Sequence, residues 1–209
     1  MRWKSMTNPC SSEQSWYGIS CVKVVDRLMP TLFNKSVSGI TSIQLPFNNL
    51  QGNLNDVNFD PVMNTLQLLD LSDNLLYGDY LPDFKSLTLY TLMIDSNGPP
   101  FQLQGVIPDS IVTNLPNLKY LSLQRHNFTG TLPSSFGDMK CSPTHYSDDI
   151  PGCYVWLLNN SLSGHVPNSI CNARYDLFYV QNNMLTCPTP CIPAAYWHTD
   201  CNQSLCVHC

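Results

Sequence analysis

The chain has 209 residues, enough for one domain with a sizeable core or for one stacked array of short repeats. Its formal net charge is −5 and its ten lysine and arginine residues are scattered, so it lacks the basic stripe that a nucleic-acid partner needs. No apolar run approaches the roughly 20 residues that cross a bilayer, and we expect no membrane span in this chain. Residues 1–10 lack the apolar core of a signal peptide, so a secreted protein would carry its signal peptide outside the given sequence.

The central part of the chain, residues 40–190, repeats one pattern about six times. The pattern is LxxLxLxxNxLxG with a proline about three residues after the glycine, and its copies start near residues 40, 66, 89, 118, 152 and 175. The third copy takes an insertion around Gly98, the fourth has His126 in place of asparagine, and the sixth has Cys187 in place of glycine. This self-similarity predicts a repeat architecture in which each copy is one structural unit.

Each LxL segment predicts a short strand whose leucines point inward, and each asparagine predicts a turn whose side chain bonds the backbone of neighbouring turns. One repeat cannot bury its own apolar face, so the copies must stack. We therefore expect an α/β solenoid that curves into an arc, with a parallel β-sheet on the concave side and irregular or 3-10 segments on the convex side. His126 is interpreted as a donor and acceptor in the asparagine ladder and not as an acid or base.

Three copies continue beyond the ladder position with a Gly-x-hydrophobic-Pro segment: Gly105-Val106-Ile107-Pro108, Gly130-Thr131-Leu132-Pro133 and Gly164-His165-Val166-Pro167. With these segments and the opening Trp16-Tyr17-Gly18-Ile19-Ser20-Cys21, the chain resembles plant-type extracellular leucine-rich-repeat proteins over roughly residues 8–190. Receptor ectodomains and polygalacturonase-inhibiting proteins belong to that family. The resemblance implies a leucine-rich-repeat arc with disulfide-stapled caps. It implies a cysteine-paired N-terminal cap over residues 1–39, closed by Cys10 and Cys21, about six repeats over residues 40–190, and a cysteine-rich C-terminal cap over residues 191–209.

The repeat lengths are less regular than in that family. The largest irregularity is an insertion between the fourth and fifth copies, which is flanked by Cys141 and Cys153. Because these two cysteines are close in sequence, we expect a disulfide that closes a small surface loop. The other six cysteines admit 15 pairings, which the sequence leaves open; they are Cys171, Cys187, Cys191, Cys201, Cys206 and Cys209.

The cysteine-rich tail also has the residue types of a zinc site, with His208 beside the last cysteines. Irregular ligand spacing and the sequon at Asn202 inside the cluster favour disulfides instead. Four glycosylation sequons, at Asn34, Asn127, Asn159 and Asn202, together with ten cysteines favour an oxidising, extracellular setting with N-linked glycans. We therefore expect a secreted protein with no metal and no cofactor.

The variable positions around each LxL segment would line the concave face of the arc. Six strands at about 4.8 Å spacing give a strip roughly 30 Å long, enough for a protein or an extended glycan. The candidate contact residues on this face are Phe47, Asp70, Asp73, Tyr90, Asp95, Tyr120, Arg125, Tyr154, Trp156 and Tyr179. The strip is acidic near its middle and aromatic toward its C-terminal end.

Exposed aromatic side chains on a rigid sheet commonly mark contact sites, although they also serve to cover neighbouring strands. A glycan on Asn159, at the end of the strand that carries Trp156, would shield part of this patch. The three aspartates are interpreted as solvated surface acids. Nothing in the sequence resembles a nucleophile–base–orienter set, a phosphate loop or a metalloprotease helix, so no catalytic residue is assigned and the chain is not expected to be an enzyme.

Three functions fit these features. The first, which the resemblance implies, is a secreted recognition module that binds a protein or carbohydrate partner through the concave face. The second is a structural subunit of an extracellular matrix, wall or filament that assembles with copies of itself. The third is an inhibitor of a wall-degrading enzyme.

Overall fold

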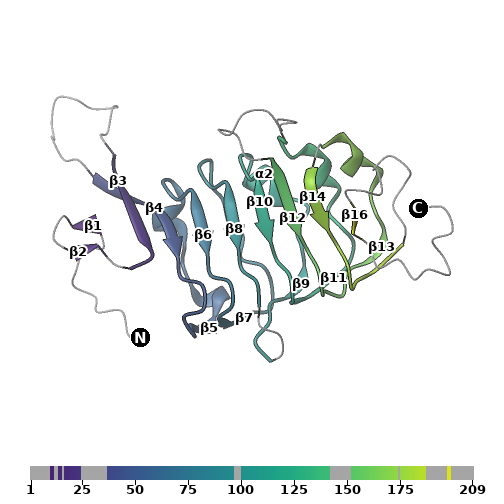
Figure 1. Ribbon diagram of the computed structural model, residues 1–209, viewed down its shortest axis with the longest axis horizontal. Coiled ribbons are helices and arrows are strands. Elements are labelled where there is room, and N and C mark those ends of the chain that lie inside the picture. Colours follow the sequence, from purple (N-terminus) through teal and green to yellow (C-terminus); the bar gives the residue numbers. More distant parts are fainter. Residues whose placement is uncertain are drawn as a thin grey trace.

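The chain forms a solenoid of stacked turns in this computed structural model, which describes residues 10–11, 14–15, 17–24, 37–96, 100–141, 152–173, 175–186 and 197–198. Its main sheet has eight strands in the spatial order β16-β14-β12-β10-β8-β6-β4-β3 (Figure 1). These strands are β3 (Ile19–Val24), β4 (Val37–Gln44), β6 (Leu68–Asp70), β8 (Thr91–Met93), β10 (Tyr120–Ser122), β12 (Cys153–Trp156), β14 (Tyr175–Tyr179) and β16 (Trp197–His198).

The six predicted repeats supply the six consecutive strands from β4 to β14, which run parallel. Their register is continuous except for one shift between Cys153 and Tyr154, where β12 pairs with β14. Leu69, Leu92 and Leu121 are neighbours across this sheet, and each is fully buried because it lies on the inward side of its strand. The predicted leucine-rich-repeat arc with a parallel concave sheet is therefore confirmed. The sheet also extends into both predicted cap segments, where β3 pairs antiparallel with β4 and β16 pairs parallel with β14.

Short second strands follow each ladder turn and pair with one another, and β5, β7, β9 and β11 lie along the lower part of Figure 1. The parallel pairs are β5 (Gln51–Asn53) with β7 (Leu75–Tyr77), β9 (Gln104–Val106) with β11 (Asn127–Thr129), and β13 (Ser163–His165) with β15 (Met184–Thr186). A separate antiparallel pair joins β1 (Cys10–Ser11) to β2 (Gln14–Ser15).

The repeated glycine lies in these second strands or directly after them, and two features of its position require glycine. Gly105, Gly130 and Gly164 have φ angles of 84°, 78° and 81°, in the left-handed region that other residues rarely adopt. A Cβ atom at Gly105 would lie 2.9 Å from the carbonyl oxygen of Asp79, in the preceding repeat. The glycine therefore allows successive turns to approach closely.

The convex side is built from single turns of helix, as predicted for irregular or 3-10 segments. These are the 3-10 turns η1 (Leu54–Asp56), η2 (Ser134–Asp138) and η3 (Asn168–Asn172) and the one-turn helices α1 (Asp60–Met63) and α2 (Ile111–Asn114). Apolar side chains from these turns and from the strands form one continuous core. Within the described ranges, no helix has the length and apolar character needed to cross a membrane.

Three ladder asparagines connect each turn to the one before it. Asn74 accepts hydrogen bonds at Oδ1 from the backbone N–H groups of Asn48 and Leu50, at 3.0 and 2.9 Å, and its Nδ2 donates to the carbonyl of Leu45 at 2.8 Å. Asn160 and Asn183 repeat this arrangement in the fifth and sixth repeats. The ladder thus satisfies backbone groups that stacking has removed from water.

His126 occupies the ladder position of the fourth repeat, as predicted. Its Nδ1 accepts a hydrogen bond from the backbone N–H of Leu103 at 3.1 Å, so Nε2 carries the proton and donates to the carbonyl of Ile94. Burial lowers the pKa of the imidazole from 6.5 to about 4, although the bond to Ile94 opposes this shift. The side chain is therefore neutral at pH 7 and performs the two tasks of an asparagine with its two ring nitrogens.

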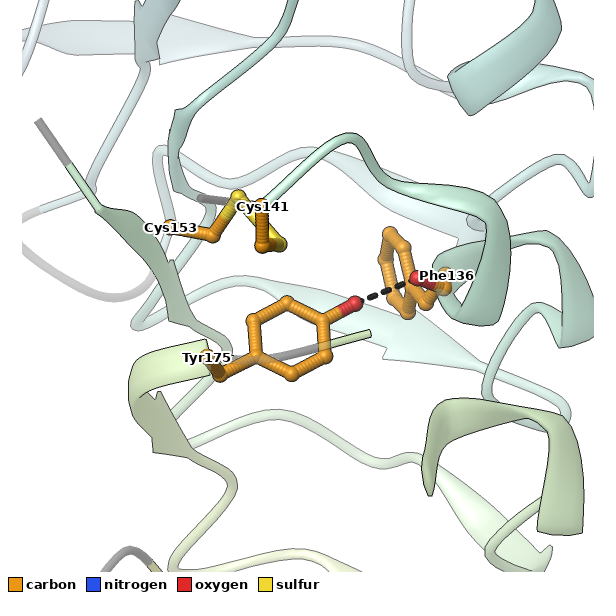
Figure 2. The surroundings of a disulfide bond; sticks show 4 residues. All are labelled: Phe136, Cys141, Cys153 and Tyr175. Atoms are coloured by element: carbon orange, nitrogen blue, oxygen red, sulfur yellow. Dashed lines mark hydrogen bonds between the residues drawn. A yellow bond between two sulfur atoms is a disulfide. The ribbon is translucent and has the colours of Figure 1, made fainter. Parts of the chain in front are cut away.

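A disulfide joins Cys141 to Cys153, the pair expected from proximity, with a Cα–Cα distance of 5.2 Å (Figure 2). It lies beside the Tyr175 side chain, whose hydroxyl donates to the carbonyl of Phe136 at 2.5 Å. Burial raises the pKa of this Tyr175 hydroxyl, so the group stays a donor. The disulfide and this bond together connect the end of η2 to β12 and β14, two strands of the concave sheet.

Cys21 is also disulfide-bonded. The side chain of its predicted partner, Cys10, lies outside the described residues, as does that of Cys171. The remaining tail cysteines, Cys187, Cys191, Cys201, Cys206 and Cys209, lie outside them as well, and so do Asn34 and Asn202. The predicted N-terminal pairing, the pairing of the last six cysteines and the sequons at the two ends stay predictions.

Candidate functional site

The concave face is the outward side of the main sheet. Because successive residues of a strand point to opposite sides, the residues between the buried leucines project from this face. In register across the sheet, one row runs Gln44, Asp70, Met93, Ser122, Trp156 and Tyr179. A second row includes Tyr120, Tyr154 and Leu177. The N-terminal part of the face is therefore polar and acidic, and the C-terminal part is aromatic.

Four aromatic residues, Tyr120, Tyr154, Trp156 and Tyr179, form one group of touching rings, here called the aromatic cluster. The ring centroid of Tyr120 lies 5.3 Å from that of Tyr154 and 5.1 Å from that of Trp156, with an edge-on contact in the second pair. Trp156 continues the cluster to Tyr179 at 6.3 Å. Each ring is half-buried, so the cluster covers neighbouring strands and also presents ring surface to solvent.

Two polar atoms near this cluster are buried without a hydrogen bond. The indole Nε1–H of Trp156 and the Oε1 of Gln181, on adjacent chain segments of the sheet, have no hydrogen-bond partner in the described part of the chain. The sequence contains no signal for these two unsatisfied atoms, because satisfaction of a buried polar atom depends on side-chain packing.

Asp95 is not the solvated acid that the sequence suggested. It is 8% exposed and accepts hydrogen bonds from the Ser122 hydroxyl, at 2.5 Å, and from the Gln124 backbone and side chain, at 3.3 and 3.0 Å. Burial raises the pKa of the Asp95 carboxyl, and these hydrogen bonds oppose that rise. The carboxylate therefore binds β8 to β10 and is not an open contact residue.

Asp70 and Asp73 are half-buried at the surface, in keeping with the expectation of solvated acids there. Asp70 accepts hydrogen bonds at Oδ1 from the backbone N–H of Ser72 at 3.0 Å and from its hydroxyl. Asp73 lies 3.8 Å from Nη1 of Arg125, a pair that crosses two repeats. Both candidates thus lie on the concave face as half-buried residues, and the side chain of Asp73 is 19% exposed.

In five of the six repeats, the residue before the ladder position has a left-handed backbone. Phe47, Asp73, Arg125, Asn159 and Asn182 have φ angles between 53° and 61°, and the N–H groups of the first four bond the next repeat. Asparagine and aspartate tolerate this region, whereas phenylalanine rarely adopts it. Phe47 is nevertheless 75% exposed. Its ring therefore lies in solvent at the edge of the concave face.

The remaining candidates fall at the borders of the face. Tyr90 is 38% exposed just before β8. Arg125 follows β10, and its side chain is 51% exposed. Within the residues described, no group of three or more histidine, cysteine, aspartate or glutamate side chains is arranged to hold a metal. His126 has both ring nitrogens occupied in the ladder and is not positioned as a catalytic base.

The two sequons within the described ranges lie close together. Asn127 and Asn159 are both exposed. The hydroxyl of Ser161, which completes the second sequon, donates to Oδ1 of Asn127, in the first, at 3.1 Å. Asn159 follows β12, the strand of Trp156, so it borders the aromatic cluster as the sequence suggested.

The stacked parallel strands and the ladder give this chain the leucine-rich-repeat fold. Residues 117–139 match the Leucine Rich Repeat family model. In sequence, the chain is 26% identical over 199 residues to pollen receptor-like kinase 2 of Arabidopsis thaliana, a match that covers 90% of this chain and 27% of that protein. The chain thus spans about a quarter of the length of this curated relative.

Solved structures of plant receptors share the fold. The leucine-rich-repeat ectodomain of the Arabidopsis thaliana receptor kinase SOBIR1 has a TM-score of 0.62 at 19% identity, over 83% of this chain and 86% of that one. Another similar chain comes from the structure of the Arabidopsis receptor kinase HAESA with the peptide hormone IDA and the co-receptor SERK1. It has a TM-score of 0.61 at 26% identity, and the match covers 87% of this chain and 26% of that one. The chain accordingly resembles the extracellular leucine-rich-repeat part of plant receptor kinases, which confirms the resemblance seen in the sequence.

Proposed function

We propose that this chain is an extracellular recognition module that binds a protein or peptide ligand through the concave face. The observation that carries the proposal is the aromatic cluster on a rigid sheet, since half-exposed tyrosine and tryptophan rings are the side chains most often found at binding hot spots. The sheet is held by a satisfied ladder and a disulfide, so the rings are pre-organised and little conformational entropy is lost on binding.

The relatives support a protein ligand over the other candidates. The HAESA structure contains a peptide hormone and a co-receptor, and a second similar structure, with a TM-score of 0.57 at 23% identity, is a complex of BIR3 with SERK2. A carbohydrate ligand is the second candidate, because the same tyrosine and tryptophan rings offer stacking surfaces to sugars. Extracellular location, glycans on Asn127 and Asn159, and the absence of catalysis belong to the same proposal.

Panning a random dodecapeptide display library on the purified chain tests the proposal. The selected peptides are then measured against the double variant Trp156→Ser with Tyr179→Ser. We expect this variant to lose at least about tenfold in affinity, because two hot-spot rings are removed. A matched control, Tyr77→Ser with Tyr80→Ser, removes two exposed aromatic rings that lie off the main sheet.

Circular dichroism confirms that both double variants fold. If the selected peptides bind the concave variant as tightly as the unmodified chain, the concave face is not the site. A panel of wall oligosaccharides serves as the second probe. Binding of the oligosaccharides with no peptide selected would assign the face to glycans and contradict the protein-ligand proposal. Ordered polymers of the chain alone in electron microscopy would support self-assembly instead.

A further inference from the structure

One buried carboxylate lies beneath the concave face. Asp95 follows β8 and is 8% exposed, and among the described residues its carboxylate has no ion-pair partner. It accepts hydrogen bonds from the Ser122 hydroxyl at 2.5 Å and from the backbone and side-chain N–H groups of Gln124 at 3.3 and 3.0 Å. A charged acceptor makes stronger hydrogen bonds than a neutral one. Asp95 therefore holds the Ser122 and Gln124 side chains in fixed orientations.

Ser122 connects this carboxylate to the aromatic cluster. It lies on the outward side of β10, yet it is completely buried, so neighbouring side chains cover it. Trp156 is its partner across β12, and Tyr120 precedes it by two residues on the same side of β10. The rings of Trp156 and Tyr120 touch edge-on, with centroids 5.1 Å apart. The Ser122 hydroxyl thus lies beside this ring contact and is closed off from solvent.

Without the carboxylate, the Ser122 hydroxyl would be a buried donor with no acceptor. Because an unsatisfied buried polar group is costly, such a hydroxyl turns toward another acceptor or admits water. Either change would occur beside Trp156 and Tyr120 and would separate their rings. With Asp95 in place, the hydroxyl donates to the carboxylate, and the two rings close over a small residue whose hydrogen bond is already made.

We propose that Asp95 and Ser122 are positioning residues of the aromatic cluster: their hydrogen bond keeps Trp156 in contact with Tyr120, and the cluster binds its ligand in that arrangement. Neither residue is a ligand contact, since both are buried. The part of the inference that concerns ligand affinity rests on the proposed function, whereas the part that concerns the ring contact does not.

The ring contact is measured without a ligand, as the nuclear Overhauser effect between the Trp156 indole and the Tyr120 ring. Affinity is measured for the tightest dodecapeptide selected on the unmodified chain. Two variants remove the acceptor, Asp95→Ala and the space-filling Asp95→Leu. We expect both to lose the Overhauser effect and to bind the peptide about tenfold less tightly, as when hot-spot rings are removed. Asp95→Asn keeps an oxygen for Ser122 and should retain the ring contact and the affinity within about twofold.

A second substitution separates positioning from a general loss of stability. Adding Ser122→Ala to Asp95→Leu removes the unsatisfied hydroxyl, so we expect the ring contact and most of the affinity to return. The matched control Ser86→Ala removes another buried hydroxyl, which donates to the carbonyl of Met63 in α1 and accepts from the N–H of Leu89. It should lower the free energy of unfolding and leave the ring contact and the affinity unchanged.

An Overhauser effect that persists in both acceptor-free variants would overturn the proposal. Its loss in Ser86→Ala or its absence from the double variant would do the same. Failure of both Asp95→Ala and Asp95→Leu to fold would also overturn it, since Asp95 would then be needed for folding itself. A lost ring contact with unchanged peptide affinity would keep the positioning role and contradict binding through the aromatic cluster. A chain that selects no peptide still reports the ring contact, so the two proposals fail separately.

Discussion

The buried side and the concave side of the same strands follow opposite rules. On the buried side, three neighbouring strands carry the same residue at the same position, and each is fully buried: Leu69, Leu92 and Leu121. On the concave side, the row through Asp70, Ser122 and Trp156 changes at each step. The difference shows that stacking constrains the side of the strands that packs into the core, whereas the outer side varies from repeat to repeat.

A substitution on the buried side should therefore cost stability in proportion to the apolar volume that it removes from the core. Leu121→Ala truncates a fully buried side chain between two turns, and we expect a loss of about 3–4 kcal/mol in the free energy of unfolding. Chemical denaturation measures it. The control Leu87→Ala truncates a leucine that is 75% exposed and should cost less than about 0.5 kcal/mol. Similar losses for the two variants would contradict the division between the two sides.

The ladder is expected to be nearly as sensitive as the leucines. Asn160→Ala leaves the N–H of Phe128 and the carbonyls of Leu123 and Leu157 without this partner, and we expect a loss of about 2–3 kcal/mol. The control Asn168→Ala removes an exposed asparagine on the convex side and should have little effect. A small loss for Asn160→Ala would mean that water replaces the ladder bonds.

The one histidine in the ladder should make stability depend on pH. Because the pKa of His126 is about 4 in the folded chain and 6.5 when unfolded, the unfolded chain takes up a proton first as the pH falls. The contribution of the neutral His126 side chain to the free energy of unfolding is full above pH 6.5. It is lost progressively toward pH 4, by up to about 3 kcal/mol. Denaturation at several pH values should show this loss relative to His126→Asn, which keeps a donor and an acceptor but does not titrate.

Comparison with His126→Asn is needed because Asp95 changes the free energy of unfolding with pH in the opposite direction. Its raised pKa means that its contribution to stability is largest at low pH and decreases as the pH rises through the folded pKa. The difference between the unmodified chain and His126→Asn cancels this effect, since both contain Asp95. A difference that does not change between pH 7 and pH 4 would contradict the buried, neutral histidine.

The smallest expected effect has the opposite sign and lies on the concave side. Phe47 has a φ of 55°, a backbone conformation that favours asparagine. The equivalent position in the fifth and sixth repeats is indeed asparagine, Asn159 and Asn182. We expect Phe47→Asn to stabilise the chain by about 0.5 kcal/mol, because backbone strain is relieved and a mostly exposed ring is lost. Thermal unfolding measures it. A destabilised variant would show that the Phe47 ring packs in solution.

Much of the fold could be predicted from the sequence because the same residue pattern recurs in each repeat. Six coincident patterns predicted six parallel strands, and the same pattern assigned His126 to the ladder from its spacing alone. The concave positions followed from the alternation of side chains along a strand. The extension of the sheet by β3 and β16 could not be read in this way, since neither strand carries the repeated pattern.

The sequence by itself determined the period, the inward leucines and the identity of the residues on the concave face, since these depend on spacing along one strand. Tertiary structure alone decided that Asp95 is buried beneath Ser122 and Gln124, that Asp73 meets Arg125, and that four aromatic rings touch. These facts depend on which side chains meet across neighbouring strands. Their distances follow from the rotamers and packing of residues on different turns of the solenoid, which no local pattern specifies.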